Sequence, residues 1–266
     1  MQLPNLQLKH VIGRGAHGTV HLAHHNLLRK PVAVKLVPDN TQSQTEALML
    51  IQMQSFPHMV RYLEHGSNGK GMLYIVMDMC NGITVGDLIH HVRHGSIVLT
   101  EKQVRILSEC IAYTLLHCHE AGMMYGDVKP DNMIFTDDQN LVMIDTGSVR
   151  YGDNFERPLG TPLFFAPEKF AHDYGRASDV WSMGVVMYML VCGHHPFVHT
   201  PMRKDYYGLV ELNIELEATP LAFHHPHWDH VSDDMKDMLR KILRKDKHRR
   251  LTIEEALTHR WWYVNM

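Results

Sequence analysis

The stretch Tyr125-Gly126-Asp127-Val128-Lys129-Pro130-Asp131-Asn132 places carboxylates, a lysine and an amide close together in the chain. Further along, Met143-Ile144-Asp145-Thr146-Gly147 ends an apolar strand with another carboxylate. We expect two neighbouring loops to bring together the polar side chains of these segments, Asp127, Lys129, Asn132 and Asp145. Such a set supplies two oxygen ligands for Mg²⁺, a cation for a phosphate and one free carboxylate. The pattern therefore indicates phosphoryl transfer, a reaction whose rate comes mainly from positioning and charge neutralisation.

A glycine-rich segment near the N-terminus, Gly13-Arg14-Gly15-Ala16-His17-Gly18-Thr19-Val20, has the spacing G-x-G-x-x-G-x-V. Glycines at these positions let a β-turn close until its backbone N–H groups reach phosphate oxygens. A dinucleotide-binding fingerprint needs a helix after the glycines, whereas a strand is expected here. Taken by itself, the segment is equally compatible with a plain hairpin turn.

The next strand, Val32-Ala33-Val34-Lys35, is apolar and ends in a charge. Lys35 is either an ordinary edge-strand lysine or a residue that grips phosphate oxygens. The second interpretation requires a carboxylate that holds the lysine in place. Glu46 is the only glutamate in the helix expected over residues 43–53, so it is the candidate partner.

The order of the expected elements predicts the fold class. Alternating segments separated by turn residues, at 8–14, 19–24, 32–37, 60–65 and 72–78, are typical of an antiparallel sheet. From Val85 the period becomes helical: Thr100 and Gln103 form a capping box, and residues 177–191 are apolar on nearly every side. Strands followed by helices predict an α+β protein of two lobes.

We expect a single domain over residues 1–266, with an N-lobe over about 1–79, a hinge at about 78–82 and a C-lobe over about 83–266. The cleft between two such lobes is the natural ligand site.

Composition excludes several other classes of protein. The 266 residues carry a formal charge of −3, so we expect no direct binding to nucleic acid. Four scattered cysteines favour a reducing compartment, and the chain shows neither a secretory signal nor about 18 consecutive apolar residues. We therefore expect an intracellular protein, in the cytoplasm or nucleus, that does not bind membranes. The histidine pairs at 24–25, 90–91 and 194–195 are expected at the surface.

From about residue 8 to residue 262, the chain resembles a eukaryotic protein kinase. The glycine-rich segment, the strand lysine and the two polar loops follow one another in the order and at the spacing of that family. Ala166-Pro167-Glu168 is similar to the A-P-E that closes the family's activation segment, and Asp179-Val180-Trp181-Ser182-Met183-Gly184 to the start of its buried central helix. Arg250 stands where the family has the arginine that pairs with the A-P-E glutamate. The resemblance implies the bilobal kinase fold, with ATP and Mg²⁺ (or Mn²⁺) as cofactors.

The resemblance also implies roles for individual residues. Asp127 would orient the acceptor hydroxyl and take its proton, and Lys129 would neutralise the γ-phosphate. Asn132 and Asp145 would hold the metal. Lys35, paired with Glu46, would hold the α- and β-phosphates.

Further residues would line the ATP site by the same resemblance. Met77 resembles the gatekeeper beside the adenine, and the backbones of Asp78 and Cys80 would make the hinge hydrogen bonds. The complete set implied for nucleotide binding is Gly13, Arg14, Gly15, Ala16, His17, Gly18, Val20, Ala33, Lys35, Met77, Asp78, Cys80, Asn132 and Asp145.

The acceptor class follows from two further similarities. Lys129 in Asp-x-Lys-Pro-x-Asn, and Gly160-Thr161-Pro162 before the A-P-E, both resemble the Ser/Thr group of kinases. Thr161 would form hydrogen bonds near Asp127 and Lys129 and shape the site for a small hydroxyl. We therefore expect proteins with Ser or Thr acceptors as partners. Asp131, beside the acceptor path, would favour basic ones.

Three features depart from the family pattern. Gly126 replaces an arginine that normally clamps a phosphate on the activation loop, so we predict activity without phosphorylation of that loop. Thr146 replaces the phenylalanine of Asp-Phe-Gly, which leaves either a looser active state or a space that a neighbour fills. Only ten residues separate Lys35 from Glu46, which is short for the family.

Two alternatives stay open on the sequence alone. The Thr146 substitution is compatible with a pseudokinase that binds nucleotide and acts as a scaffold or allosteric partner. The segment Ile144-Asp145-Thr146-Gly147-Ser148 also resembles an aspartic protease motif, but that chemistry needs two carboxylates and hence a homodimer here.

In size, the chain resembles kinases of large DNA viruses such as the small baculovirus protein kinase. That similarity would imply a host-cell location and a basic DNA-packaging protein as substrate.

Overall fold

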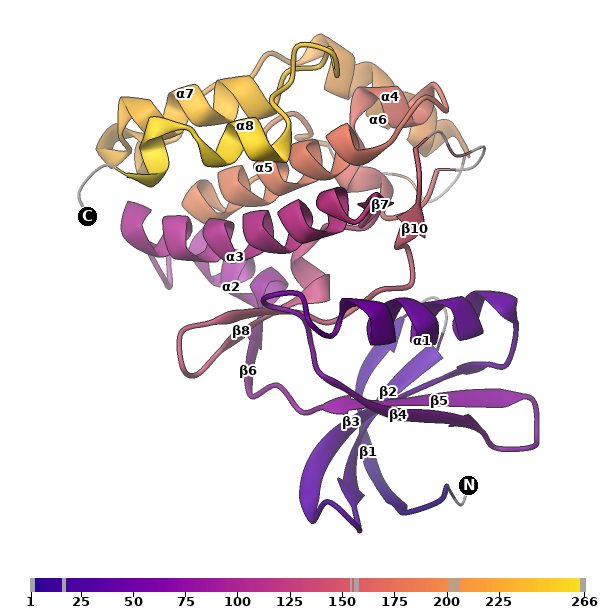
Figure 1. Cartoon of the computed structure of the whole chain (residues 1–266). Coiled ribbons are helices and arrows are strands. Elements are labelled where there is room, and N and C mark those ends of the chain that lie inside the picture. Colours follow the sequence, from indigo (N-terminus) through magenta and orange to yellow (C-terminus); the bar gives the residue numbers. More distant parts are fainter. Residues whose placement is uncertain are drawn as a thin grey trace.

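Figure 1 shows the computed structural model of the chain, which describes residues 3–15, 18–153, 155, 158–200, 203 and 206–263. The predicted α+β architecture is confirmed: a lobe built on an antiparallel sheet precedes a mainly helical lobe. Ala16 and His17, two of the residues predicted to bind ATP, lie outside the described residues.

The first lobe contains a five-stranded sheet in the order β1-β2-β3-β5-β4, with all neighbours antiparallel. Its strands are β1 (Leu6–Gly15), β2 (Gly18–His25), β3 (Lys30–Pro38), β4 (Tyr62–Ser67) and β5 (Met72–Asp78). Because side chains alternate along a strand, the sheet buries a cluster on each face. Val34 lies in one cluster, and Val37 lies in the other, with residues of the following helix.

That helix, α1 (Thr41–Met53), covers one face of the sheet (Figure 1). It begins two residues before the predicted start because the Asn40 side chain accepts a hydrogen bond from the Ser43 N–H and caps the helix. Ala47 and Leu50 are buried in the cluster beneath it, and Glu46 is buried as well. The packing of α1 thus fixes the direction of the Glu46 carboxylate.

Strand β4 starts two residues later than predicted because Val60 pairs with the second lobe instead. The Val60 N–H donates to the Met143 carbonyl at 2.9 Å, and the Met143 N–H donates to the His58 carbonyl at 2.7 Å. These bonds join the segment after α1 to the strand that ends just before Asp145.

The second lobe is built mainly from helices. They are α2 (Val85–Arg93), α3 (Glu101–Glu120), α4 (Pro167–Phe170), α5 (Arg176–Cys192), α6 (Tyr206–Ala218), α7 (Asp233–Ile242) and α8 (Ile253–Leu257). Short 3₁₀ helices lie at Pro130–Asn132, Pro162–Phe164, Pro226–His230 and Arg260–Trp262. Two small sheets complete the lobe, with order β6-β8-β9 and β10-β7. Their strands are β6 (Gly82–Thr84), β7 (Met123–Met124), β8 (Met133–Thr136), β9 (Leu141–Met143) and β10 (Arg150–Tyr151).

Helix α5 forms the centre of this lobe and is buried along nearly its whole length, as its apolar sequence predicts. It packs against α3, which begins with the predicted Thr100–Gln103 capping box. The second lobe therefore provides a rigid base for the loop between β7 and β8, which carries Asp127, Lys129 and Asn132, and for the loop after β9, which carries Asp145.

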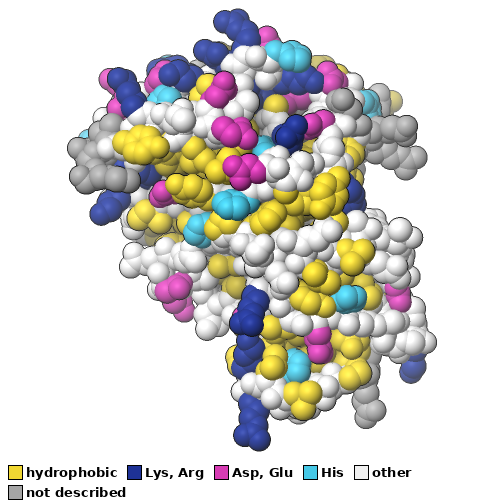
Figure 2. All heavy atoms as spheres, viewed as in Figure 1, with side chains coloured by type: hydrophobic (Ala, Val, Ile, Leu, Met, Phe, Trp, Pro, Cys, Tyr) yellow, Lys and Arg dark blue, Asp and Glu magenta, His cyan; other side chains and the backbone are white. Residues whose placement is uncertain are grey.

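The surface mixes side chains of both charge signs with scattered apolar ones, as the face in Figure 2 shows. Among the described residues, no helix is both long enough and apolar enough to span a membrane. The prediction of surface histidines is wrong for His25 and His195, which are 3% and 7% exposed. Both rings are enclosed by neighbouring elements that the local sequence does not reveal.

Candidate active site

Asp127 lies at the centre of a hydrogen-bond network in the loop between β7 and β8. Its Oδ1 accepts a hydrogen bond from the Thr161 N–H at 2.8 Å, and its Oδ2 lies 2.8 Å from the Lys129 Nζ. The Asn132 amide donates to Oδ2 at 3.1 Å and to the Asp127 carbonyl at 3.0 Å. The carboxylate is thereby fixed in position by three groups that the sequence predicted to lie near it.

Lys129 connects this loop to the segment before α4. Its Nζ donates to the Thr161 hydroxyl at 2.8 Å while it contacts Asp127. Thr161 thus contacts Lys129 through its side chain and Asp127 through its backbone. The predicted contact of Thr161 with both residues is present.

Asn132 and Asp145 are the residues predicted to hold Mg²⁺. Because the Asn132 nitrogen is engaged by Asp127, its amide oxygen is the atom left to face a cation. Within the described ranges, no cluster of three or more His, Cys, Asp or Glu residues could hold a metal ion. Mg²⁺ commonly uses only one or two protein ligands and completes its shell with phosphate oxygens and water. An amide oxygen and a carboxylate fit that mode of binding.

Lys35 joins the two lobes. Its ammonium group contacts the Glu46 carboxylate of α1 and lies 3.1 Å from Asp145 Oδ1 in the second lobe. Burial disfavours the charge of Lys35, but the Asp145 and Glu46 carboxylates outweigh that effect and raise its pKa. Burial likewise opposes ionisation of Asp145, yet Lys35 and the Gly147 N–H hold its pKa below the ordinary value. Despite the short connection between Lys35 and Glu46, the two side chains meet, and Lys35 and Asp145 are held in their charged forms.

Thr146, the second departure from the family pattern, is buried beside α1. The side chain is 2% exposed, and its hydroxyl donates to the Glu46 carbonyl at 3.1 Å. A hydrogen bond therefore links the loop after β9 to α1 at the very residue that pairs with Lys35. Thr146 thus contacts α1 through a hydrogen bond, at the position where the family pattern has an aromatic side chain.

Tyr125 stabilises the loop after β9, which carries Asp145. Its ring is buried, and its hydroxyl donates to the Asp145 carbonyl at 2.5 Å. Burial raises the pKa of Tyr125 well above its usual value, so the phenol keeps its proton and remains a donor. The loops that carry Asp127 and Asp145 are thus bonded directly to one another.

The glycine-rich segment forms a hairpin between β1 and β2, in which Gly13 pairs with Val20 and Gly15 with Gly18. A Cβ at Gly18 would lie 2.0 Å from the Leu36 carbonyl oxygen, so a side chain there is excluded by the close approach of β3. Arg14 pairs with Thr19 in the same hairpin. At Gly18, packing of the strands is therefore a sufficient reason for glycine.

The residues predicted to surround the adenine lie on neighbouring strands. Val20 on β2 lies opposite Lys35 on β3, and Ala33 on β3 lies opposite the buried Met77 on β5. The Asp78 N–H donates to the Arg61 carbonyl at 3.0 Å, and the Asp78 carbonyl lies 4.0 Å from the Cys80 Sγ, which donates to it. Cys80 follows in the connection to β6 and is half-buried.

Asp179 is a structural anchor of the site whose role the sequence analysis missed. Its carboxylate, in the first turn of α5, accepts hydrogen bonds from the backbone N–H groups of Tyr125 at 2.8 Å and Gly126 at 2.9 Å. The ring of His119 lies 3.0 Å from the same group. The sequence signal for this role was that Asp179 is the one carboxylate near the start of an otherwise apolar helix.

The predicted pair of Arg250 and Glu168 is also present. The Arg250 side chain is completely buried, and its two terminal nitrogens bond to the two Glu168 oxygens at 2.5 and 2.9 Å. Bidentate arginine–carboxylate pairs have a defined geometry. This one joins α4 to the loop that precedes α8.

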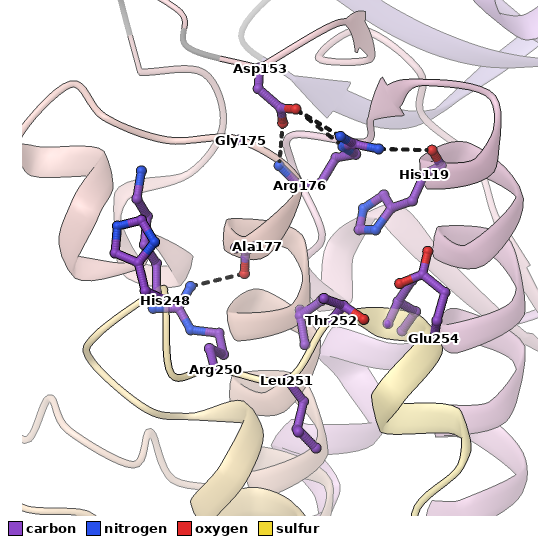
Figure 3. Close-up of a pocket in the computed structure, with 13 residues that line it drawn as sticks. His119, Asp153, Gly175, Arg176, Ala177, His248, Arg250, Leu251, Thr252 and Glu254 are labelled. Carbon is purple, nitrogen blue, oxygen red and sulfur yellow. Dashed lines mark hydrogen bonds and ion pairs between the residues drawn. The ribbon is translucent and has the colours of Figure 1, made fainter.

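A pocket of about 370 Å³ lies between the start of α5 and the segment around α8, and His119 and Arg250 are in its lining (Figure 3). In Figure 3, Asp153 points toward Arg176, whose Nη1 donates to the His119 carbonyl at 3.1 Å. Asp153 accepts from the Arg176 backbone N–H at 2.9 Å and from its Nη2 at 3.0 Å. This contact anchors the segment after β10 to the second lobe.

Comparison with known proteins identifies the family. The protein kinase domain matches residues 6–262. The chain is 28% identical over 265 residues to calcium-dependent protein kinase 5 of Plasmodium falciparum (isolate 3D7), which covers 96% of this chain and 44% of that protein. It is 30% identical over 266 residues to calcium-dependent protein kinase 14 of Arabidopsis thaliana, which covers 94% and 48%.

A shorter relative, calcium/calmodulin-dependent protein kinase type 1B of Rattus norvegicus, is 29% identical over 266 residues, covering 96% of this chain and 74% of that protein. The chain thus spans less than half the length of the two calcium-dependent kinases but most of the length of this one. The matched region contains every loop and helix of the site described above. The chain belongs to the protein kinase family.

Proposed function

We propose that the chain transfers the γ-phosphate of ATP to serine and threonine hydroxyls of proteins, with Asp127 as the base. The observation that carries this proposal is the network around Asp127, whose carboxylate is held by the Thr161 N–H and the Lys129 ammonium. A base must be held within hydrogen-bond reach of the proton that it accepts. Members of this family use ATP and Mg²⁺, which provide the phosphoryl group and offset its charge when bound.

The chain's own residues have four tasks in this scheme. Asp127 orients the acceptor hydroxyl and takes its proton, and Lys129 neutralises negative charge on the transferred group. Asn132 and Asp145 present oxygen atoms to the cation. Lys35 holds the remaining phosphates, and its contacts with both lobes keep it charged and in place. Positioning and electrostatic stabilisation are the main contributions that phosphoryl transfer requires.

Thr161 supports serine and threonine as the acceptors. It lies against both Lys129 and Asp127, so it forms one wall of the space that an acceptor side chain would enter. A wall held this close to the base favours a short hydroxyl side chain over a phenol. Transfer to Ser and Thr peptides, but not to matched Tyr peptides, is therefore expected.

The test measures phosphate transfer from labelled ATP to a protein panel for the wild type, Asp127→Asn and Asp137→Asn. Asp137 is an exposed aspartate in the turn after β8, so its substitution controls for the same chemical change. We expect transfer to fall by about 10²-fold or more in Asp127→Asn and to be kept in Asp137→Asn. Equal transfer by all three proteins would remove Asp127 from the mechanism.

The pseudokinase alternative predicts a different result in the same assay. It was motivated by Thr146, but the Thr146 hydroxyl is bonded to α1 at Glu46, which supports an ordered active state. Binding of a fluorescent ATP analogue without any transfer to protein would favour the pseudokinase and contradict the proposal.

We also propose that activity does not require phosphorylation of the activation segment. Gly126 offers no cation for a phosphate, and its φ of +87° is a backbone conformation that favours glycine. A Cβ there would lie 2.5 Å from the Ser148 carbonyl oxygen. The carboxylate of Asp153 already bonds to Arg176 and supplies a permanent negative anchor for the segment.

The protein is treated with phosphatase, and mass spectrometry verifies that no phosphate remains. We expect this protein to be fully active from the first turnover. Ser148→Ala should retain that activity. A lag that disappears after stoichiometric phosphorylation of Ser148 or Thr161 would contradict the proposal.

Basic proteins are the proposed substrates. Asp131 is exposed at the start of the 3₁₀ helix Pro130–Asn132, beside Lys129, and offers a carboxylate to basic residues near the acceptor. Asp131→Asn is expected to raise the KM of a basic peptide several-fold and to leave that of an acidic one unchanged.

An intracellular location is proposed as well. All four cysteines are free thiols, which supports a reducing compartment.

A further inference from the structure

Lys169, the residue after Glu168 in α4, is 1% exposed. Lysine is almost never fully buried without partners. Here the Nζ donates to the Gly126 carbonyl at 2.9 Å and to the Leu159 carbonyl at 3.0 Å. The Gly126 carbonyl belongs to the loop between β7 and β8, residues 125–132, here called the catalytic loop. The Leu159 carbonyl belongs to the activation segment, which runs from Asp145 to Glu168.

Ring and carboxylate contacts of Lys169 stabilise a cation against the cost of its burial. Its Nζ lies 4.9 Å from the ring centroid of Phe165 and 5.3 Å from that of Tyr174, both within cation–π range. Burial lowers the pKa of Lys169, and the Asp179 and Asp127 carboxylates oppose that change. A buried charge at this position has a cost that a leucine or methionine would avoid, so its contacts point to a specific role.

Both carbonyls lie next to the base. Gly126 directly precedes Asp127, and Leu159 precedes Gly160 and Thr161, whose N–H bonds to Asp127 Oδ1. At Gly160, with φ of +102°, a Cβ would lie 2.5 Å from the Gly126 carbonyl oxygen, so the two segments touch there. Lys169 bonds to the same Gly126 carbonyl and to the carbonyl of Leu159, one residue before Gly160.

We propose that Lys169 is a positioning residue that holds the Leu159–Thr161 part of the activation segment against the catalytic loop, as an internal cation in place of an arginine clamped to a phosphate. The proposal rests on the proposed function, because it assigns a device that aligns Thr161 with Asp127. Gly126 has no side chain to provide the cation, and Lys169 provides it to the backbone carbonyl of the same residue.

The test compares Lys169→Met with Lys245→Met. Lys245 is a matched control, since its Nζ also donates to two carbonyls, those of Glu217 and Thr219, and lies 5.6 Å from the Phe197 ring. Both variants lose the same kind of contact, but Lys245 is bonded to neither the catalytic loop nor the activation segment. Peptide kcat and KM, ATP affinity and unfolding temperature are measured for each.

Lys169→Met is expected to lower peptide kcat/KM by about tenfold or more, because small misplacements of reacting groups are costly, while ATP affinity changes less than about twofold. Lys245→Met is expected to keep both values. Equal kinetics for the two variants, or a parallel loss of ATP affinity and turnover in Lys169→Met, would overturn the proposal. If Lys169→Met does not fold, Lys169→Gln and Lys245→Gln make the same comparison, since the amide keeps donors but loses the charge.

Hydrogen exchange separates this proposal from the proposed function. Faster exchange at the Thr161 amide in Lys169→Met than in Lys245→Met is expected whether or not the wild type transfers phosphate. Absence of transfer by the wild type would contradict only the proposed function. Unchanged exchange at Thr161 would contradict the role of Lys169.

Discussion

At the scale of single residues, the site depends on side-chain hydroxyls that join neighbouring segments. Thr146 stands where the family has a phenylalanine, and its hydroxyl bonds to the Glu46 carbonyl. Tyr125 directly precedes Gly126, and its hydroxyl bonds to the Asp145 carbonyl. In both cases a side-chain donor reaches a backbone acceptor on a neighbouring segment, so the exact side chain can differ while the link remains.

The Thr146 link leads to a prediction for stability. Thr146→Val keeps the shape of the side chain but removes the donor, so we expect a loss of about 1 kcal/mol in the free energy of unfolding. Thr146→Ser keeps the hydroxyl and serves as the control for the bond. Denaturant unfolding of the three proteins measures the difference. A Thr146→Val protein as stable as the wild type would show that the hydroxyl does not contribute to stability.

At the scale of elements, buried charges join segments that are far apart in the chain. Asp179 at the start of α5 holds the catalytic loop by two backbone N–H groups, and Arg250 before α8 holds Glu168 in α4. Ion pairs of this kind differ from those at the surface because breaking them leaves an uncompensated charge in the interior.

That difference predicts unequal effects of one chemical change at two sites. Glu168→Gln leaves the completely buried Arg250 without a charged partner and should cost about 3 kcal/mol or more in the free energy of unfolding. Glu211→Gln is the matched control, because its pair with Arg203 is exposed and such pairs contribute little. Urea denaturation followed by circular dichroism checks both. Similar midpoints for the two variants would contradict the importance of the buried pair.

At the scale of the whole molecule, the abundant histidines link stability to pH. His195 is buried, with its Nε2 2.9 Å from the Leu163 carbonyl and its Nδ1 accepting hydrogen bonds from the N–H groups of Phe197 and Val198. This geometry requires a neutral ring protonated at Nε2. Burial lowers the pKa of His195 from 6.5 to about 4, an effect that the Leu163 hydrogen bond only partly offsets.

The sign of the pH dependence follows from linkage. The unfolded chain binds a proton at His195 near pH 6.5, whereas the folded protein resists protonation until about pH 4, so stability falls as the pH decreases through this window. The contribution amounts to about 3 kcal/mol at most. We expect His195→Asn, which keeps an acceptor near the Nδ1 position, to show a shallower loss between pH 6.5 and 4. Parallel stability curves for the variant and the wild type would contradict this assignment.

Much of the fold could be predicted from the sequence because its signals are local. Alternation of apolar residues located the strands of the first sheet, and the capping pair at Thr100 marked the start of α3. Spacing alone placed Asp127, Lys129, Asn132 and Asp145 on neighbouring loops, and the structure brings them together. The limits of elements were less certain, since α1 is extended by its Asn40 cap and β4 is shortened where Val60 pairs with Met143 instead.

By itself, the sequence determined the succession of strands and helices, the identity of the polar groups at the site and the membership of the kinase family, since all three depend on residue type and order. Only the tertiary structure decided which groups meet: that Glu46 reaches Lys35 across a short connection, that Thr146 bonds to α1, and that Lys169 and His195 are buried. The physical reason is that burial and hydrogen bonding depend on neighbours distant in the chain, whereas propensity and spacing depend on adjacent ones.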